Sequence, residues 1–335
     1  MIGTFQDGEA SSPKNQPLTQ DGWMAADLHV HTLCSPDVLP SSTLHPKALY
    51  SRAKKLGFGF ITFTDHNTMS AYDHIGWKRE GLVTGVEISI KDMDLVGHTI
   101  HVNVYDLDLE QFHELKSIAS EGDLLSFLDC AKRDGLPCVY NHPLWFEPGE
   151  RPNLAAIPEV ITLFSVIEYN MYRIKRKNEI AIELSKRFGR GLVAATDTHS
   201  GQIGKCYTLS QGDDFRDYFK NIERGRSRVF IKDMTKQDFV EEINTWIDLI
   251  FSHDLLPGVK DFSTGIFYID AIIHALAGET IRGFPRLWDK AFGFCRRISN
   301  SGVPASLYLQ SEAARLGEIE NLLSDVLDER MPLME

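Results

Sequence analysis

The feature that most constrains the fold of this chain is a series of short apolar runs that end in side chains able to bind metals. The first run, residues 26–37, places His29 and His31 two positions apart and Asp37 shortly after them. In an extended strand, side chains two positions apart point to the same face, so both imidazoles project together. Such a pair alone is more often two ordinary strand histidines, so its meaning depends on the rest of the sequence.

Further strand-like runs carry similar chemistry. Four of them, residues 60–67, 82–87, 137–143 and 192–199, end in histidine or a carboxylate, and the run 99–104 contains a histidine. Coincidence explains so many matching ends poorly. We therefore take nine side chains as candidate metal ligands: His29, His31, Asp37, His66, Glu87, His101, His142, Asp197 and His199.

The order of the predicted elements favours an α/β fold. Strand patterns alternate with helical patterns from residue 26 to about residue 210, which predicts βα units and a mainly parallel sheet. In a closed barrel the carboxyl ends of the strands ring a single mouth. Because ligand-type side chains follow so many strand ends, we expect a barrel, of about seven strands, in preference to an open sheet.

Hydrophobic periodicity and turn residues place the elements along the chain. The expected strands lie within residues 26–31, 58–64, 82–90, 98–107, 136–140, 166–169, 191–196 and 206–210. The expected helices of this part are residues 46–56, two pieces within 109–133, and 173–188. We expect Gly57 to end the first helix and Asp123 to cap the helix that begins after Gly122.

The chain is expected to have three parts. Residues 1–24 are polar and form a flexible N-terminal tail, residues 25–230 form the barrel, and residues 231–335 form a helical extension. The extension has a helical stripe of apolar side chains that includes Phe239 and Trp246, and it carries no ligand cluster. Such a stripe indicates core packing or a partner interface, so the extension could mediate an oligomer.

Composition limits the classes of partner. The chain has 35 Lys and Arg against 47 Asp and Glu, a net charge of −12, which argues against a broad nucleic-acid surface. An anionic substrate remains compatible with this charge if bound metal ions supply local positive charge. The five cysteines form no CxxC pair, and their odd number fits a reducing compartment. No apolar run approaches the length of a membrane span, and residues 1–24 lack a signal-peptide pattern, so we expect a cytoplasmic protein.

The types of the candidate ligands indicate which ions to expect. Imidazoles and carboxylates without thiolates suit Zn, Mn or Fe. Nine groups are too many for one ion, so we expect two or three divalent ions. Glu87 could bridge two of them. His101 is preferred to His98 as a ligand because it lies within the apolar alternation of its run, whereas His98 lies at the turn before it.

The sequence resembles the PHP (polymerase and histidinol phosphatase) domain family. The resemblance rests on His29-Val-His31-Thr with Ser35-Pro36-Asp37, on Thr64-Asp65-His66-Asn67, on Gly85-Val86-Glu87, on His101, on Asn141-His142-Pro143 and on Asp197-Thr198-His199-Ser200. It implies a distorted (β/α)7 barrel with up to three divalent metals at its mouth, and phosphoester hydrolysis. The family often has Ser-Asp-Gly after the first motif, so Asp37 is displaced by one residue here.

The implied chemistry needs a metal-bridging hydroxide to attack phosphorus, and positive charge to stabilise the phosphate oxygens. The nearby basic residues are Arg173, Lys175, Arg176 and Lys177, of which Arg173 is nearest to the strand end, and Lys205 is a weaker candidate. Asp65 could orient a metal-bound imidazole or cap the turn that follows it. Cys34 lies in the site loop, but a metal-activated water leaves no role for it as a nucleophile.

Two other functions fit parts of this pattern. An amidohydrolase barrel also begins with HxH and would cleave C–N bonds, but that class normally uses a bridging lysine, and here a carboxylate, Glu87, follows the third run. A metal-binding interaction module without catalysis is the other alternative. Within phosphoester hydrolysis, the substrate could be a small phosphomonoester, a nucleotide or the end of an oligonucleotide. The acidic net charge favours small substrates weakly.

Overall fold

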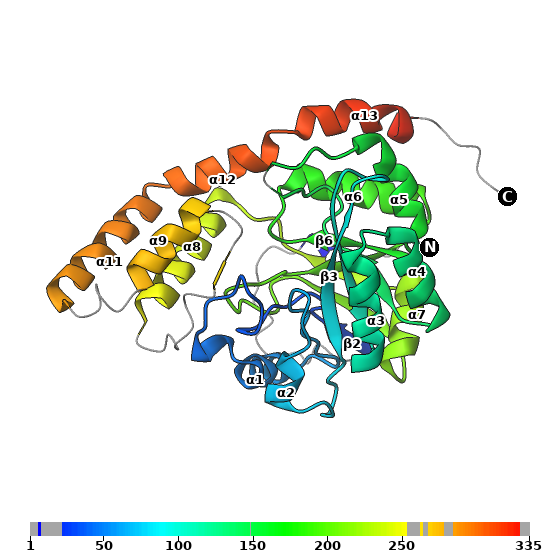
Figure 1. The fold of residues 1–335 in the computed structure, drawn as a ribbon, viewed down its shortest axis with the longest axis horizontal. Coiled ribbons are helices and arrows are strands. Elements are labelled where there is room, and N and C mark those ends of the chain that lie inside the picture. The colour runs from blue at the N-terminus through cyan, green and yellow to red at the C-terminus, as the bar shows by residue number, and fades with distance from the viewer. Residues whose placement is uncertain are drawn as a thin grey trace.

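The computed structural model describes residues 6–7, 22–147, 149–252, 262–263, 267–277 and 284–328. It has a mixed α/β fold in which helices surround two sheets, and a second group of helices forms a lobe beside this body (Figure 1). Most of the predicted N-terminal tail, residues 1–24, lies outside the described residues. The division of the chain into tail, barrel and extension stays a prediction.

The main sheet has five strands in the order β3-β4-β5-β6-β7. Their bounds are Gly85–Asp92 (β3), His98–Tyr105 (β4), Cys138–Tyr140 (β5), Val166–Asn170 (β6) and Gly191–Ala195 (β7). The first three strands pair antiparallel, and β5, β6 and β7 pair parallel. Every residue of β4, β6 and β7 is buried, as expected for strands covered on both faces.

A second sheet has four strands in the order β1-β9-β8-β2. Their bounds are Gln6–Asp7 (β1), Trp23–Ala26 (β2), Tyr207–Gln211 (β8) and Arg228–Ile231 (β9). The strand predicted within residues 206–210 therefore exists as β8, but it belongs to this sheet and pairs antiparallel with β2 and β9. The sequence analysis did not predict β9.

The prediction of a closed seven-stranded barrel is wrong for the described part of the chain, which contains no closed ring of strands. Between β7 and β3 the chain makes only isolated parallel bridges, which join Val30 to Thr198, Ile61 to Leu82 and His66 to Glu87. The expected strands within 26–31 and 58–64 are thus mostly irregular, apart from β2.

Side chains explain this interruption, because they take hydrogen bonds that a strand ladder would use. The backbone N–H of Val30 donates to Thr64 Oγ1 at 3.1 Å. The backbone N–H of Phe63 donates to the Tyr72 hydroxyl at 3.1 Å, and the Tyr105 hydroxyl donates to the carbonyl of Leu28 at 2.8 Å. These bonds satisfy buried backbone groups without regular strand pairing.

Helices pack around the two sheets. Their bounds are Pro46–Leu56 (α1), Ala71–Ile75 (α2), Leu109–Ser120 (α3), Leu124–Arg133 (α4), Ile157–Leu163 (α5), Lys175–Arg187 (α6) and Phe215–Glu223 (α7), with 3-10 turns at Ser42–Leu44 (η1) and Leu154–Ala156 (η2). Gly57 ends α1 with a left-handed φ of 84°, and Asp123 caps α4 by accepting from the N–H of Ser126. Both predicted helix ends are confirmed.

The C-terminal part of the described chain is helical. Its helices are Lys236–Phe251 (α8), Phe267–Ala277 (α9), Pro285–Asn300 (α11), Val303–Ala313 (α12) and Leu316–Asp328 (α13). Helices α8, α9 and α11 form the lobe at the left of Figure 1, and α13 lies over the body at its top. Arg176 on α6 donates to Glu320 on α13 at 2.7 Å, which ties the end of the chain to the body. No described helix is long and apolar enough to cross a membrane.

The first residue of β7 tests how tightly helix α7 packs on the sheet. A Cβ at Gly191 would lie 2.4 Å from the carbonyl oxygen of Ile222, so Gly191→Ala would force two backbones apart. We expect the variant to lose about 1–3 kcal/mol of unfolding free energy, measured by urea denaturation. Gly293→Ala is the control, because nothing lies within 4 Å of that position in α11. It should be neutral or stabilising, and equal effects of both changes would contradict the packing described here.

Candidate metal centre

The nine candidate ligands converge at one end of the body, where the carboxyl ends of several strands meet. His29 and His31 follow β2, Glu87 lies in β3 and His101 lies in β4. His142 follows β5, Asp197 and His199 follow β7, and Asp37 and His66 lie outside the strands. The imidazole rings lie against one another. The centroids are 4.2 Å apart for His31 and His199, 4.7 Å for His31 and His66, and 5.1 Å for His101 and His142. The predicted convergence of these side chains is therefore present.

Eight of these residues form three overlapping groups of potential ligand atoms. Within each group, one ligand atom from every residue lies within 4.8 Å of the others. The groups are His31, Asp37, His66 and His199; His29, His31 and Asp197; and His66, Glu87 and His101. His31 and His66 each belong to two groups. The ninth residue, His142, places Nε2 at 3.4 Å from Glu87 Oε1.

Glu87 occupies the centre of this arrangement. Its Oε2 lies 3.0 Å from His29 Nε2 and 3.2 Å from His66 Nδ1, and its Oε1 lies 3.1 Å from His101 Nδ1. Asn141 Nδ2 also donates to Oε1 at 2.8 Å. Burial disfavours the charged carboxylate, but these imidazoles hold the pKa of Glu87 well below its usual value. Both oxygens of one carboxylate thus face different imidazoles, which is the arrangement expected of a bridging ligand.

Asp37 reaches the cluster despite its displacement by one residue. Its Oδ2 lies 2.8 Å from His199 Nε2 and 3.3 Å from His66 Nε2, and Ser35 Oγ donates to its Oδ1 at 2.6 Å. His98 does not join the cluster, because its Nδ1 lies 2.9 Å from the carbonyl oxygen of Val96. The preference for His101 over His98 agrees with this geometry.

Several ligand atoms have no protein partner, and this fits a bound cation. His31 Nδ1 and Asn141 Oδ1 are buried without a hydrogen-bond partner in the described part of the chain, and the ring nitrogens of His101 face the carboxylates of Glu87 and Glu147 at 3.1 and 3.8 Å. His29 Nε2 and His31 Nε2 lie only 3.1 Å apart, and both face Asp197 Oδ1. Burying polar atoms with free lone pairs costs free energy unless a hydrogen-bond donor or a metal ion binds them. A set of nitrogen and oxygen donors without thiolate suits divalent Zn, Mn or Fe.

Two ligands lie on strained backbone. His142 has φ 28° and Asp197 has φ 51°, in a region that residues other than glycine rarely adopt. Such strain persists where the surroundings fix the residue, and it is common at functional sites. The bonds around Glu168, described next, provide this fixation for both residues.

Glu168 on β6 is a site residue that the sequence analysis missed. Its Oε1 accepts from His29 Nδ1 at 2.8 Å, and its Oε2 accepts from the backbone N–H of His142 at 3.0 Å. Asn170 Nδ2 lies 3.1 Å from Glu168 Oε2 and 2.9 Å from Asp197 Oδ2. Glu168 and Asn170 therefore orient three candidate ligands. The signal in the sequence was an acidic residue within the predicted strand 166–169, whose other residues are apolar or aromatic.

Arg173 is the predicted cation that the structure brings to the cluster. One guanidinium nitrogen lies 3.7 Å from Asp197 Oδ2, another donates to Glu312 at 3.3 Å, and the group lies 5.2 Å from the centre of the Trp145 ring. Its Nε is buried without a partner among the described residues. Arg173 also lines a cavity of about 190 Å³ above the cluster, which we call the cluster cavity.

The other predicted cations have acidic residues as partners or neighbours. Lys177 pairs with Glu312 at 3.4 Å, Lys175 with Asp233 at 3.2 Å, and Arg176 with acidic residues of α6 and α13. Lys205 has Lys232 and acidic residues of α8 as its charged neighbours, and it is not among the described residues that line the cluster cavity. The structure therefore gives no support for Lys205 as a phosphate-binding residue.

Asp65 has a different role from the one expected. It does not hydrogen-bond an imidazole in the described structure; instead its two oxygens accept from the backbone N–H and the hydroxyl of Thr32, at 2.6 and 2.7 Å. Asp27 binds Thr196 in the same way, at 3.0 and 2.6 Å. Burial raises the pKa of each carboxyl to about 7. These two Asp–Thr pairs fix the segments that carry His31 and Asp197.

Comparison with known families identifies the family of this chain. The sequence matches the PHP domain over residues 27–245. The chain belongs to the PHP domain family. The resemblance drawn from the motifs is thereby confirmed, and the nine converging side chains lie within the matched residues. Membership in this family and the three ligand groups together indicate that the protein binds divalent metal.

Solved structures give similar results for the fold. PsfC from Pseudomonas syringae PB-5123 aligns with a TM-score of 0.50 and 16% identity, over 68% of this chain and 98% of PsfC. The lesion-specific endonuclease PfuEndoQ from Pyrococcus furiosus aligns with a TM-score of 0.43 and 12% identity, over 62% of this chain and 57% of that chain. A comparison with curated proteins finds no match. The likeness to PsfC supports the fold only.

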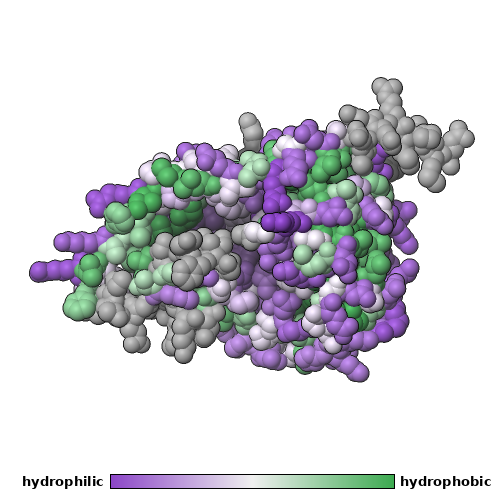
Figure 2. Space-filling model, turned by 45° about the horizontal axis from the view of Figure 1, so that its top comes forward, coloured by the Kyte–Doolittle hydropathy of each residue, from purple (hydrophilic) through white to green (hydrophobic). Residues whose placement is uncertain are grey.

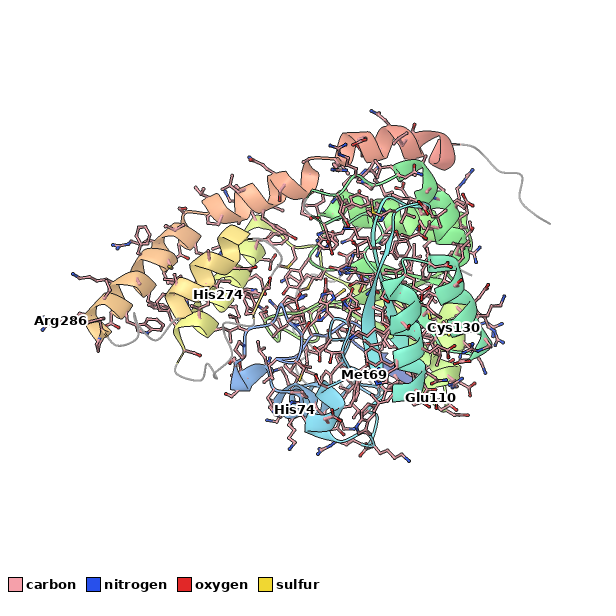
Figure 3. All side chains as sticks on the ribbon, in the orientation of Figure 1. Met69, His74, Glu110, Cys130, His274 and Arg286 are labelled. Atoms are coloured by element: carbon pink, nitrogen blue, oxygen red, sulfur yellow. The ribbon has the colours of Figure 1, made fainter. Side chains whose placement is uncertain are left out.

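We call the nine converging side chains the PHP cluster. Two histidines outside it, His74 and His274, have ordinary partners. Figure 3 shows His74 on α2 and His274 on α9, each well away from the centre of the body. The His74 ring lies 5.4 Å from that of His45, and His274 Nε2 lies 2.8 Å from the carbonyl oxygen of Phe262. A fourth group of potential ligand atoms consists of Glu114, Cys130 and Asp134. Its Glu114 already pairs with Arg133 at 2.8 Å. None of these places resembles the PHP cluster.

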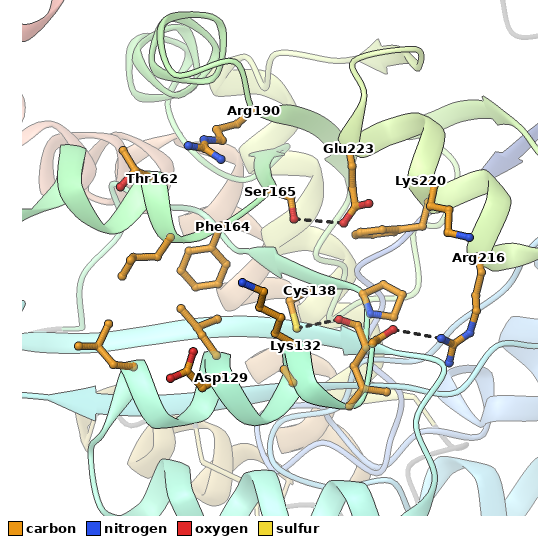
Figure 4. A pocket seen from close by; sticks show the side chains of 18 residues that line it. Asp129, Lys132, Cys138, Thr162, Phe164, Ser165, Arg190, Arg216, Lys220 and Glu223 are labelled. Carbon is orange, nitrogen blue, oxygen red and sulfur yellow. Dashed lines mark hydrogen bonds between the residues drawn. The ribbon is translucent and has the colours of Figure 1, made fainter.

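A larger cavity of about 760 Å³ lies at the opposite end of the sheet (Figure 4). Its walls include Cys138, Ser165 and Arg190, which stand at or just before the amino ends of β5, β6 and β7. Ligands of α/β proteins generally bind at the carboxyl ends of parallel strands. The size of this cavity therefore does not make it the site of chemistry, and the PHP cluster is the better candidate.

Removing the charge of Glu168 tests its role in orienting the ligands. In Glu168→Gln an amide N–H₂ would compete with donors from His142 and Asn170, so we expect the affinity for Zn²⁺ or Mn²⁺ to fall about 10–100-fold. Competition with a chelating dye measures this affinity. Glu159→Gln, at an exposed position in the first turn of α5, is the matched control. Equal affinities of the two variants would contradict the orienting role.

The affinity for metal should depend steeply on pH. Burial disfavours protonated His199 and His101, but Asp37 and Glu87 outweigh burial and raise the pKa of each imidazole to about 9. Both imidazoles are therefore in the cationic form, with both ring nitrogens protonated, at neutral pH. A bound metal must displace one proton from each. We expect the affinity to rise at least about tenfold per pH unit from roughly pH 6 to pH 8. A dissociation constant that stays flat over this range would contradict these shifts.

Proposed function

We propose that this protein is a metal-dependent phosphoesterase that hydrolyses a phosphate ester by means of a metal-bridging hydroxide. The observation that carries the proposal is the group of nine imidazoles and carboxylates around Glu87, with the unpaired Nε of Arg173 beside it. PHP family membership supports a metal-dependent hydrolase in general. The nine residues would hold two or three ions of Mn, Zn or Fe, which supply the hydroxide near neutral pH.

The residues of the chain have separate tasks in this proposal. Glu87 and Asp197 would neutralise part of the positive charge of the bound metal ions. Glu168 keeps His29 in the orientation that presents Nε2 to the cluster. Arg173 faces the space above the ligands and would donate to a phosphate oxygen as negative charge builds there. Trp145 holds the guanidinium from one side, at 5.2 Å. Trp145 and Trp246 also line the cluster cavity.

The two alternative functions lose support. An amidohydrolase would normally need a bridging lysine, and the described lining of the cluster cavity contains none. A metal-binding module that had lost catalysis would be expected to lack some ligands, whereas all nine positions carry competent side chains. A small phosphomonoester is the substrate that we favour, because the net charge of −12 disfavours a broad nucleic-acid surface. Cytoplasmic location and an oligomer formed through the extension stay predictions.

Substitution of single ligands tests the proposed function. In Asp197→Asn and His29→Ala, we expect kcat/KM for phosphoesters to fall at least about a thousandfold, because each change removes a group that would hold the metal. A panel of phosphoesters and amides, assayed with Mn²⁺, Zn²⁺ and Fe²⁺ on protein purified without chelator, measures this. Asp129→Asn and His113→Ala change the same residue types at exposed positions and should keep full activity.

The panel also separates the alternatives. Cleavage of amides with no cleavage of phosphoesters would replace the phosphoesterase by a C–N hydrolase. Near-normal phosphoester turnover in Asp197→Asn or His29→Ala would count heavily against the assignment of the metal ligands. Metal analysis of the purified protein identifies the ions that copurify with it.

A further inference from the structure

An apolar pocket of about 520 Å³ adjoins the cluster cavity. Arg173, Asp197, His199 and Trp246 line both spaces, so the two lie side by side. The pocket lies where the helical lobe meets the body, and Figure 2 shows a hollow at this junction with hydrophobic residues on the side of the lobe. A cavity of this size is typical of small-molecule sites.

Helix α8 supplies most of the apolar wall. Phe239, Ile243, Trp246 and Ile250 recur at spacings of three or four residues and lie on the face of α8 that borders the pocket. Ile243 and Trp246 are only half-buried, although both are large apolar side chains. A face that exposes such residues toward a cavity gains free energy when an apolar group fills the cavity.

Glu242 and Tyr308, two polar side chains of this wall, already have partners. Glu242 accepts from Gln202 Nε2 at 2.5 Å, and the Tyr308 hydroxyl donates to the carbonyl oxygen of Tyr172 at 3.0 Å. A sugar or another group rich in hydroxyls would leave its own hydrogen bonds unmade here, which is costly. An acidic group would face the carboxylate of Glu242.

We infer that the substrate is a phosphomonoester whose alcohol part is an uncharged apolar group, bound in this pocket. The inference rests on the proposed function and specifies its substrate class. Hydrolysis of such an ester adds one water across the phosphorus–oxygen bond and releases the apolar alcohol and inorganic phosphate. The phosphate would lie at Arg173 and the metal ligands, and the alcohol would extend along α8.

A second pocket beside the cluster fits the alcohol less well. This polar pocket, of about 660 Å³, also reaches Arg173, but charged side chains such as Lys177 and Arg315 line it. Lys177 pairs with Glu312, and Arg315 donates to the carbonyl oxygen of Glu150 at 2.7 Å. These groups are already satisfied, and an apolar group gains little free energy among them.

Binding of non-hydrolysable phosphonates tests the inference without relying on turnover. Benzylphosphonate and methylphosphonate share the anionic head and differ in the apolar part. We expect metal-loaded protein to bind benzylphosphonate at least about tenfold more tightly in calorimetry. Ile243→Asn should reduce this preference to less than about threefold. Ile298→Asn, the same change on α11 at a position that is 43% exposed, should keep it.

The outcomes distinguish this inference from the proposed function. Equal binding of the two phosphonates overturns the apolar pocket, even if phosphoesters are hydrolysed. A tenfold preference without hydrolysis of benzyl phosphate supports the pocket and contradicts the phosphoesterase. An unchanged preference in Ile243→Asn also overturns the pocket. If Ile243→Asn unfolds, Ile243→Ala replaces it, and a thermal melt of each variant shows that it is folded.

Discussion

The structure depends on keeping six imidazoles and three carboxylates close together at one end of the body. Isolated ionisable groups are expensive to bury. Here carboxylates and imidazoles face each other at 2.8–3.4 Å, as in the contacts of Asp37 with His199 and of Glu87 with His142. Buried nitrogen and oxygen atoms without a hydrogen-bond partner, such as His31 Nδ1, remain in this region. Such atoms are suited to binding cations. The rest of the site keeps these groups in place.

The irregular segments near the cluster follow from this requirement. A continuous strand would fix its backbone through a neighbouring strand, but here Asp27 and Asp65 hold Thr196 and Thr32 by two bonds each. These short connections allow the chain to turn abruptly after His31. The backbone of Asp197 is left-handed, with φ 51°, in the segment that the Asp27–Thr196 bonds hold. An open arrangement of strands is therefore compatible with a precise site.

The helical extension completes the site in a way that the PHP motifs do not indicate. Glu312 on α12 pairs with Arg173 and with Lys177, so this helix places a carboxylate beside both cations. Trp246 on α8 lines both the cluster cavity and the apolar pocket. The nine candidate metal ligands and the apolar side chains of α8 thus lie in different parts of the chain, which would allow one set to vary without the other.

The sequence by itself determined the family, and it predicted the candidate ligands through their residue types and the order of their motifs, because side-chain chemistry and short motifs are local properties. It also predicted helix ends such as Gly57. Only the tertiary structure decided the partners of the ligands. Glu168 lies 139 positions from His29, and Glu312 lies 139 positions from Arg173. Which distant segments approach each other depends on packing of the whole chain, so the role of Asp65, the place of Lys205 and the open barrel could not be predicted from local pattern.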